Sequence, residues 1–297
     1  MRAAIVRTFG GPDVVEIAEI PLPEPGRGQV RIKVAAAALN PVDAGVRVGV
    51  FGGDGTPLGL GWDVAGTIDA VGEGAADLAV GDEVVGLAYG HRKPLGTHAE
   101  YVVIDASAVA TAPRSADAVL AATLPLNALA AAQALDLLAL EPGDSVLITG
   151  AAGALGGYAV QLAYHRGLKV AALASEADED LVRSLGAQDF VARTATPAQV
   201  DGVLDAAVIG APALEFVRDG GAYAGVIPGA EPEGVRGIRA GAIEVNPDGT
   251  RLAELVGLVD EGHLTLRVAQ TYPLDQAGVA HGRLAEGGLR GRLVLVP

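Results

Sequence analysis

The residues best suited to chemistry form a glycine-rich run, Thr149-Gly150-Ala151-Ala152-Gly153-Ala154-Leu155-Gly156. The run follows an apolar stretch, Val146–Ile148, and leads into a helical stretch that we place at Leu155–Arg166. A glycine at position 153 lets the backbone approach a diphosphate, and one at position 156 lets the helix pack against the strand. Exposed N–H groups and the helix dipole attract negative charge there. This A-x-G-x-x-G turn between a strand and a helix predicts a dinucleotide site rather than a purely structural turn.

The next predicted strand indicates which dinucleotide fits. NAD recognition usually places a carboxylate at the tip of this strand, to bind the ribose 2′-hydroxyl, but the tip here is Ala172-Leu173-Ala174-Ser175. Ser175 can donate to a 2′-phosphate, and Arg193, after the third strand, can supply positive charge. The acidic run Glu176–Asp180 disfavours a phosphate, and we interpret it as charge at a helix N-terminus. We predict NADPH as the cofactor, with NADH as the alternative and Glu176 as its ribose ligand.

Composition excludes several other kinds of chemistry. The chain has no cysteine, so disulfides, thiolate nucleophiles and cysteine-based zinc sites are excluded. A net charge of −15 without any Lys or Arg block disfavours nucleic acid and anionic membranes as partners. The uncharged segment Ala118–Leu135 approaches the length of a membrane span, but Pro125 and Gln133 interrupt it, and we predict a buried connecting segment. The N-terminus begins as a strand without a signal peptide, which predicts a cytoplasmic protein.

The elements that must position these residues change in character along the chain. Up to about residue 115, short β-rich runs alternate with turns, which predicts a compact barrel or sandwich. From there to about Gly262, strands alternate with helices, as βαβ units require. After Gly262 a strand, a helix and a last strand follow. We therefore predict an α/β protein with a β-rich domain, 1–115 completed by 263–297, and a doubly wound parallel-sheet domain, 116–262.

Ordered blocks along the whole chain resemble one known family. The blocks are Phe9–Val14, Pro23–Val30, Leu39-Asn40-Pro41-Val42-Asp43, Gly61–Gly66, Val80–Val84, Leu124–Asn127, Glu141–Asp144, the glycine run, Ser184–Ala187 and Arg290–Val294. Together they resemble the zinc-free quinone oxidoreductases of the medium-chain dehydrogenase/reductase superfamily. A competing match to the short-chain dehydrogenases, Tyr89-Gly90-His91-Arg92-Lys93, lies upstream of the glycine run in a Gly- and Pro-flanked turn. We interpret that match as chance.

The resemblance implies a GroES-like substrate domain, a Rossmann domain and hydride chemistry. In zinc-dependent relatives, a Cys and a His hold the catalytic metal at the positions of Asn40 and Trp62 here, so no metal site is expected. Asn40 and Asp43 are the expected catalytic residues, in positioning roles. The expected cofactor-binding residues are Asn40, Asn127, Ala152, Gly153, Ala154, Leu155, Ser175, Arg193, Val226, Ile227, Val245 and Arg292.

The activity that these residues predict is hydride transfer from NADPH to a quinone or an α,β-unsaturated carbonyl. Two family features are missing: the Tyr or Lys expected two residues after Asp43 is Gly45, and a frequent Thr is Ala130. No general acid is evident, so we expect solvent to protonate the product, while His91 and His98 are interpreted as solvated. The alternative functions are a non-catalytic NADPH-binding redox sensor or scaffold and a module similar to a polyketide enoyl reductase. The resemblance also implies a homodimer paired through a strand near Ile243–Val245.

Overall fold

The computed structural model describes residues 1–53, 55–75, 77–195 and 198–297, which form two compact units. The first unit consists of Met1–Leu126, Pro247–Glu261 and Leu266–Pro297. The second unit consists of Asn127–Asn246 and Gly262–Thr265. Each unit has its own sheet and is described by itself.

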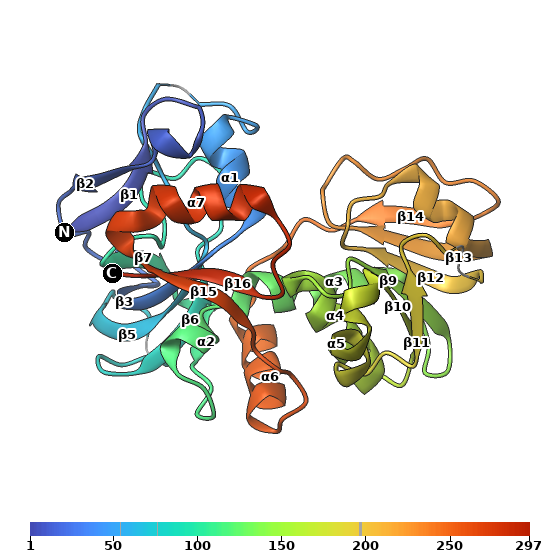
Figure 1. The fold of residues 1–297 in the computed structure, drawn as a ribbon. Helices are drawn as coiled ribbons and strands as arrows, with labels where there is room; N and C mark the ends of the chain where they lie inside the picture. Colours follow the sequence, from blue (N-terminus) through green and yellow to red (C-terminus); the bar gives the residue numbers. More distant parts are fainter. Residues whose placement is uncertain (54, 76, 196–197) are drawn as a thin grey trace. The chain divides into compact units, whose positions relative to one another are not determined.

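The first unit is built mainly from antiparallel strands (Figure 1). Its strands are β1 (Arg2–Val6), β2 (Glu16–Glu19), β3 (Gln29–Leu39), β4 (Leu58–Gly59), β5 (Asp63–Val71), β6 (Glu83–Leu87), β7 (Tyr101–Asp105), β8 (Val109–Thr111), β15 (Val268–Pro273) and β16 (Arg292–Val296). One sheet has the order β2-β1-β4, and the other has the order β15-β16-β3-β5-β6-β8, with β7 paired to β3. The core between these strands is aliphatic and includes Val30, Ile32, Val64 and Val84.

The helices of the first unit are α1 (Pro41–Val48), α2 (Ala118–Ala121), α6 (Gly249–Asp260) and α7 (Ala277–Glu286). The C-terminal segment returns to this unit because β16 pairs with β3, with Leu293 opposite Leu39. The helix α7 packs its buried face, Ala277, Ala280 and His281, toward these strands. The last strands thereby complete a sheet that the N-terminal residues begin.

The limits of these units differ in three places from the predicted domains, 1–115 with 263–297 and 116–262: residues 116–126 and 247–261 lie in the first unit, and residues 263–265 lie in the second. The first unit extends to Leu126, whose N–H group donates to the buried carboxylate of Asp63 at 2.5 Å. It also contains α6, because Asp260 accepts hydrogen bonds from the N–H and hydroxyl groups of Ser115 at 2.9 and 2.7 Å. Contacts of this kind join residues far apart in the chain, and local sequence pattern does not reveal them.

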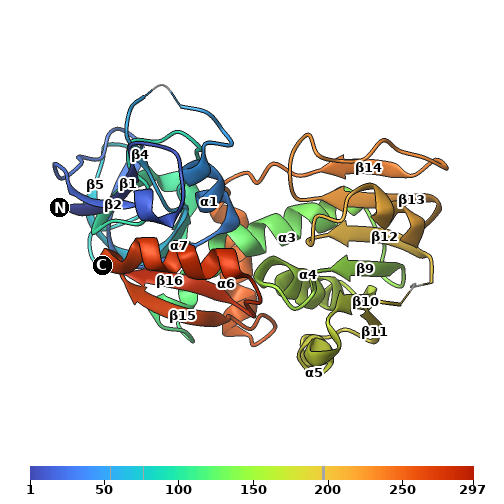
Figure 2. The ribbon, with the colours of Figure 1, turned by 45° about the horizontal axis from the view of Figure 1, so that its top comes forward.

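The second unit is a parallel sheet with helices packed on it. Its strands are β9 (Ser145–Thr149), β10 (Lys169–Ala174), β11 (Asp189–Ala192), β12 (Val200–Asp205), β13 (Val217–Gly225) and β14 (Arg239–Ala242). They lie side by side in the order β11-β10-β9-β12-β13-β14 (Figure 2), and every pairing is parallel. The helices are α3 (Pro125–Leu138), which starts at the end of the first unit, α4 (Ala154–His165) and α5 (Glu179–Ser184).

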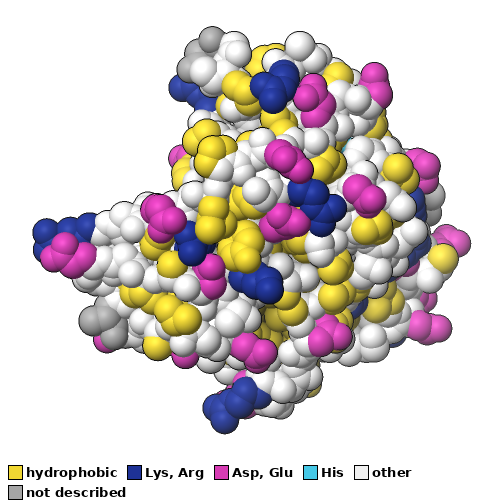
Figure 3. Space-filling model, turned by 90° about the vertical axis from the view of Figure 1, so that its left-hand side faces the viewer, with side chains coloured by type: hydrophobic (Ala, Val, Ile, Leu, Met, Phe, Trp, Pro, Cys, Tyr) yellow, Lys and Arg dark blue, Asp and Glu magenta, His cyan; other side chains and the backbone are white. Residues whose placement is uncertain are grey.

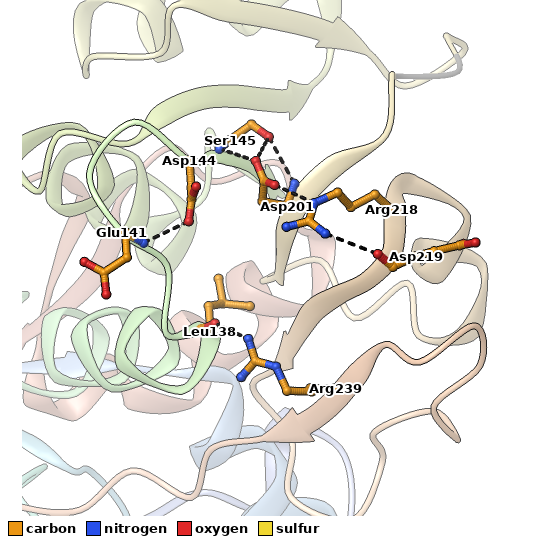
Figure 4. A network of polar contacts seen from close by, with 8 residues as sticks. All are labelled: Leu138, Glu141, Asp144, Ser145, Asp201, Arg218, Asp219 and Arg239. Carbon is orange, nitrogen blue, oxygen red and sulfur yellow. Dashed lines mark hydrogen bonds and ion pairs between the residues drawn. The ribbon is translucent and has the colours of Figure 1, made fainter.

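Polar contacts hold the amino-terminal edge of this sheet together (Figure 4). The Asp201 carboxylate accepts hydrogen bonds from the N–H and hydroxyl groups of Ser145, at 2.8 and 2.5 Å, and from Arg218 at 2.5 Å. These hydrogen bonds lower the pKa of Asp201 to about 2. Arg239 donates to the carbonyl of Leu138 at 3.2 Å. These contacts tie the amino-terminal ends of β9, β12 and β13 to one another.

Among the described residues, no helix combines the length and the apolar composition that crossing a bilayer requires. The segment Ala118–Leu135 is largely buried and divides into α2 and α3. On the face that Figure 3 shows, Lys and Arg side chains are interspersed with Asp and Glu.

Candidate active site

The glycine run lies at the switch point of the parallel sheet. The first strand of the second unit, β9, has β10 on one side and β12 on the other, so the strand order reverses beside it. Open sheets of this kind bind ligands outside the carboxyl ends of the strands at such a point. The turn after β9 ends in α4, whose N-terminal residue is capped by Gly153. The first helical N–H groups, from residues 154 to 156, have no acceptor within the helix and are available to an anion.

Glycine occupies two positions of the turn, 153 and 156, for different physical reasons. A Cβ atom on Gly156 would lie 2.2 Å from the carbonyl oxygen of Gly150, so any larger residue would push α4 away from the turn. A Cβ atom on Gly153 would lie 3.1 Å from the same oxygen, which is tight but not prohibitive. Gly153 is half-buried, as are Ala154 and Leu155, and its missing side chain leaves the turn open to a ligand. The turn thus fits a diphosphate.

The predicted residues for a 2′-phosphate lie on neighbouring strands. In the parallel register of β10 and β11, Ala174 is the partner of Ala192. Ser175 and Arg193 directly follow these partners, at the carboxyl ends of two neighbouring strands. Arg193 is exposed, while the hydroxyl group of Ser175 donates to Asp178. Because the Ser175 hydroxyl gives its proton to Asp178, the exposed guanidinium of Arg193 is the group suited to a phosphate.

A buried polar network fixes the loop that follows β12. The carboxylate of Asp205 is fully buried and accepts from the hydroxyls of Thr149 at 2.6 Å and Tyr223 at 2.8 Å. It also accepts from the N–H group of Gly210 at 2.8 Å. Burial, and secondarily the bond to Asp205, raises the pKa of Tyr223. The network joins the carboxyl ends of β9, β12 and β13, and so keeps the edge that carries the glycine turn rigid.

Other predicted cofactor residues of the second unit lie along the same edge. Val226 and Ile227 directly follow β13, and Val245 lies three residues after the end of β14. Gly225 and Ala242 are partners in the register of these two strands, so the two segments leave the sheet side by side. Asn127 is buried in α3. Their roles toward a cofactor stay predictions.

In the first unit, the predicted residues Asn40, Asp43 and Arg292 gather around Asp63. Asn40 precedes α1, and its side-chain amide donates to the carboxylate of Asp63 at 2.6 Å. Asp43 is fully buried and accepts from the N–H groups of Asn40 and Gly61, both at 2.8 Å. Asp43 therefore joins the start of α1 to the segment before β5, and it does so without reaching the surface.

Asp63 is a site residue that the sequence analysis missed. Burial raises its pKa to about 7, while the hydrogen bonds from Leu126 and Asn40 and the charge of Arg292 lower it. The neighbouring charge of Asp43 raises it further. In the sequence, Asp63 is part of the block Gly61–Gly66 and only indicates where a strand starts. Local pattern therefore did not predict that its carboxyl group is buried.

A group of aromatic side chains beside Asp63 was also missed. Trp62 lies with its ring centroid 5.1 Å from those of Tyr89 and His91, and His91 lies 4.0 Å from Phe51. The ammonium group of Lys93 is 4.8 Å from the centroid of the Trp62 ring. His91, which we predicted to be solvated, is therefore half-buried among rings. His98, predicted likewise, is buried with its Nε2 atom 3.0 Å from the carbonyl oxygen of Ala38.

Comparison with known proteins identifies the family. The family model described as "Alcohol dehydrogenase GroES-like domain" matches residues 26–114, and "Zinc-binding dehydrogenase" matches residues 176–295. The NADPH-dependent alkenal/one oxidoreductase of Arabidopsis thaliana chloroplasts is 33% identical over 313 residues, which span 100% of this chain and 80% of the relative. The quinone oxidoreductase structure from Coxiella burnetii has a TM-score of 0.91 at 29% identity and covers 100% of this chain and 99% of that chain. The chain belongs to the quinone oxidoreductase branch of the medium-chain dehydrogenase/reductase superfamily.

Membership in this superfamily makes the chain an oxidoreductase and confirms the predicted fold class, a GroES-like β-rich part with a Rossmann sheet. A mycobacterial member of the superfamily, solved in complex with NADPH, has a TM-score of 0.84 at 26% identity and covers 100% of both chains. The name of the second family model mentions zinc. Within the described ranges, however, no group of three or more His, Asp or Glu side chains is arranged to hold a metal ion.

Proposed function

We propose that this medium-chain reductase transfers a hydride from NADPH to a quinone or an α,β-unsaturated carbonyl, without zinc. The observation that carries the choice of cofactor is the exposed Arg193, which directly follows β11, beside the strand β10 that ends at Ala174 without a carboxylate at its tip. Relatives named for NADPH-dependent alkenal/one reduction and for quinone reduction support the acceptor class.

Different residues of the chain bind different parts of the cofactor. When bound, NADPH supplies the hydride. The N–H groups at the start of α4, residues 154 and 155, hold the diphosphate, while that of Gly153 donates to the Gly150 carbonyl at 2.9 Å and shapes the turn. The guanidinium of Arg193 holds the 2′-phosphate. Asn40 and Asp43 act as positioning residues, because their hydrogen bonds to Asp63 and Gly61 fix the start of α1. The protein contributes orientation and exclusion of water, and the cofactor contributes the redox chemistry.

Zinc independence is part of the proposal and rests on the side chains around Asp63. Asn40 uses its amide to bind Asp63, and Trp62 offers an indole ring, which is not a metal ligand. We further propose a cytoplasmic homodimer that acts on a small molecule and binds neither nucleic acid nor a membrane. The exposed edge strand of the parallel sheet, β14, is the expected dimer contact, since unpaired edges can pair with a second copy.

Side-by-side titrations with NADPH and NADH test the cofactor. A ligand that binds only the folded protein raises its melting temperature, and we expect the larger rise with NADPH. Arg193→Gln should weaken NADPH binding about tenfold and leave NADH binding within about twofold, since a charge-assisted hydrogen bond contributes about 1.5–3 kcal/mol. The control is Lys169→Gln, an exposed cation at the opposite end of β10, which should change neither affinity. Equal binding of both dinucleotides by the wild type contradicts the choice of NADPH.

A non-catalytic NADPH-binding sensor or scaffold is the alternative. It is favoured by Gly45 and Ala130, which stand where the family often has polar side chains. Loss of NADPH absorbance on adding quinones or enones distinguishes the two functions. Tight binding without acceptor-dependent oxidation across a broad panel of both classes favours the sensor.

A further inference from the structure

In the first unit, a lysine ammonium group lies against a cluster of aromatic side chains, and the proposed function assigns no role to it. We define the cluster as Phe51, Trp62, Tyr89 and His91, whose ring centroids lie 4.0 to 5.8 Å apart. The rings come from three segments: Phe51 follows α1, Trp62 precedes β5, and the other two follow β6. The ammonium group of Lys93 lies over the ring of Trp62, in a cation–π contact.

Lys93 has hydrogen-bonding capacity to spare. An ammonium group carries three N–H donors. Lys93 donates one of them to the carbonyl oxygen of Ala88, and no other acceptor among the described residues bonds its Nζ atom. The backbone holds the segment in place, because the carbonyl of Lys93 accepts from Gly59 at 2.8 Å and Ala88 donates to the carbonyl of Trp62 at 2.7 Å. Lys93 is half-buried, so a ligand can reach it.

The absence of a side chain at Gly45 belongs to the same arrangement. A Cβ atom on Gly45 would lie 3.1 Å from the Cε2 atom of Phe51. A larger residue there would push Phe51, and Phe51 is the ring that packs closest to His91. Glycine at position 45 therefore leaves room for the ring of Phe51 in the cluster.

We propose that Lys93 is a catalytic residue that donates a hydrogen bond to the acceptor's carbonyl oxygen, while the aromatic cluster stacks against the acceptor's flat conjugated system. The inference rests on the proposed reduction of a quinone or an α,β-unsaturated carbonyl. Flat conjugated carbonyls are the chemistry that an aromatic surface beside a fixed cation recognises.

The chemistry of the acceptor explains what Lys93 contributes. When an enone accepts a hydride at its β-carbon, the C=C pair shifts toward the carbonyl and the negative charge collects on the carbonyl oxygen. A positive N–H donor at that oxygen stabilises the charge as it develops, as donors of an oxyanion hole do. A proton from water then adds to the α-carbon and completes the saturated ketone.

The charges near Lys93 keep it protonated despite its surroundings. Burial lowers the pKa of Lys93 to about 8, and the negative charges of Asp43 and, once it has lost its proton, of Asp63 counteract that effect. The titratable groups around it are Asp43 on α1, Asp63 at the start of β5, and Tyr89, His91 and His98 after β6. The ammonium form is therefore present at neutral pH.

The first experiment measures catalysis by Lys93→Met. We expect kcat/KM for an enone or a quinone to fall about 10²-fold, as for the loss of one donor to a developing oxyanion, with the Kd of NADPH unchanged. Lys93→Arg should recover part of the activity, because it keeps the charge. The control is Lys33→Met, which removes an exposed lysine on β3 and should behave as the wild type. A Lys93→Met protein that folds, binds NADPH and keeps kcat/KM within threefold overturns the inference.

A second readout does not depend on turnover. Trp62 is the only tryptophan of the chain, so its fluorescence reports the cluster alone. Between pH 6 and 10 the wild type should show an emission change with a midpoint near the pKa of Lys93, about 8, and Lys93→Met should lack it. 4-Nitrophenolate, an unreactive flat anion, should quench Trp62 in the wild type and bind at least tenfold more weakly to Lys93→Met.

The two readouts separate this inference from the proposed function. If the wild type reduces no acceptor but its Trp62 signals depend on Lys93 as described, the function is wrong and the anion-binding cluster stands. If the wild type reduces acceptors and Lys93→Met matches it in both catalysis and quenching, the function stands and the role of Lys93 is refuted.

Discussion

The carboxyl group of Asp63 is buried in the first unit and has a strongly raised pKa. It is fully buried, and two hydrogen bonds of 2.5 and 2.6 Å reach its two oxygens. Even so, burial dominates and its pKa rises to about 7, far above the usual 3.8. A buried group that holds its proton this strongly makes stability depend on pH.

Asp63→Asn should flatten that dependence. Between pH 4 and 7 the folded protein keeps the proton on Asp63, whereas the unfolded chain releases it near 3.8. The wild type therefore loses stability as the pH rises through this window, by at most about 1.4 kcal/mol per pH unit, and loses no more above about 7. Urea unfolding at intervals from pH 4.5 to 8.5 measures the slope. The exposed Asp13→Asn should keep the wild-type slope, and an equally steep slope in Asp63→Asn contradicts the assignment.

At the scale of elements, the strand β9, its turn and α4 form the part that sequence predicts best. The predicted helix, Leu155–Arg166, differs from α4 by one residue at each end, because glycine spacing and apolar pattern act locally. The same turn offers a direct test of why its glycines are there.

Gly156→Ala should destabilise the protein, by about 1–3 kcal/mol, because its Cβ atom meets the Gly150 carbonyl oxygen at 2.2 Å and α4 must shift. Gly282→Ala, in the middle of α7 with nothing within 4 Å of the added atom, should stabilise it by about 0.5–1 kcal/mol. Chemical unfolding of both variants and the wild type provides the comparison. A Gly156→Ala protein as stable as the wild type removes the packing role assigned to this glycine.

Contacts between residues far apart in the sequence could not be predicted from local sequence pattern. The helix α6 lies within residues 116–262, which were assigned to the other domain, and its bond to Ser115, which places it in the first unit, spans 145 residues. Lys93 was set aside as part of a chance match because it lies upstream of the glycine run. Its contact with Trp62, thirty-one positions earlier in a different segment, could not be read from local pattern. Ser175 and Arg193, by contrast, were placed at the ends of consecutive predicted strands, and those strands, β10 and β11, are neighbours in the parallel sheet.

At the scale of the whole molecule, net charge and the proposed cofactor oppose each other. The chain carries −15 charges, and NADPH is a polyanion. The acidic segment from Glu176 to Asp180 lies directly after Ser175, and only local groups such as Arg193 and the amides of the glycine turn attract phosphate. Long-range repulsion slows encounter, while short-range attraction holds the bound state.

Salt should therefore change the two rates of NADPH binding in the same direction. Raising the ionic strength from about 0.01 to 0.1 M shortens the Debye length from about 30 to 10 Å, so repulsion weakens and the association rate should rise about threefold. The dissociation rate should also rise, because salt weakens the pairing of Arg193 with the 2′-phosphate. Stopped-flow fluorescence of NADPH measures both. Arg193→Gln should keep the rise in association and lose the salt dependence of dissociation. An association rate that falls with salt would show that positive potential at the turn outweighs the charge of the whole molecule.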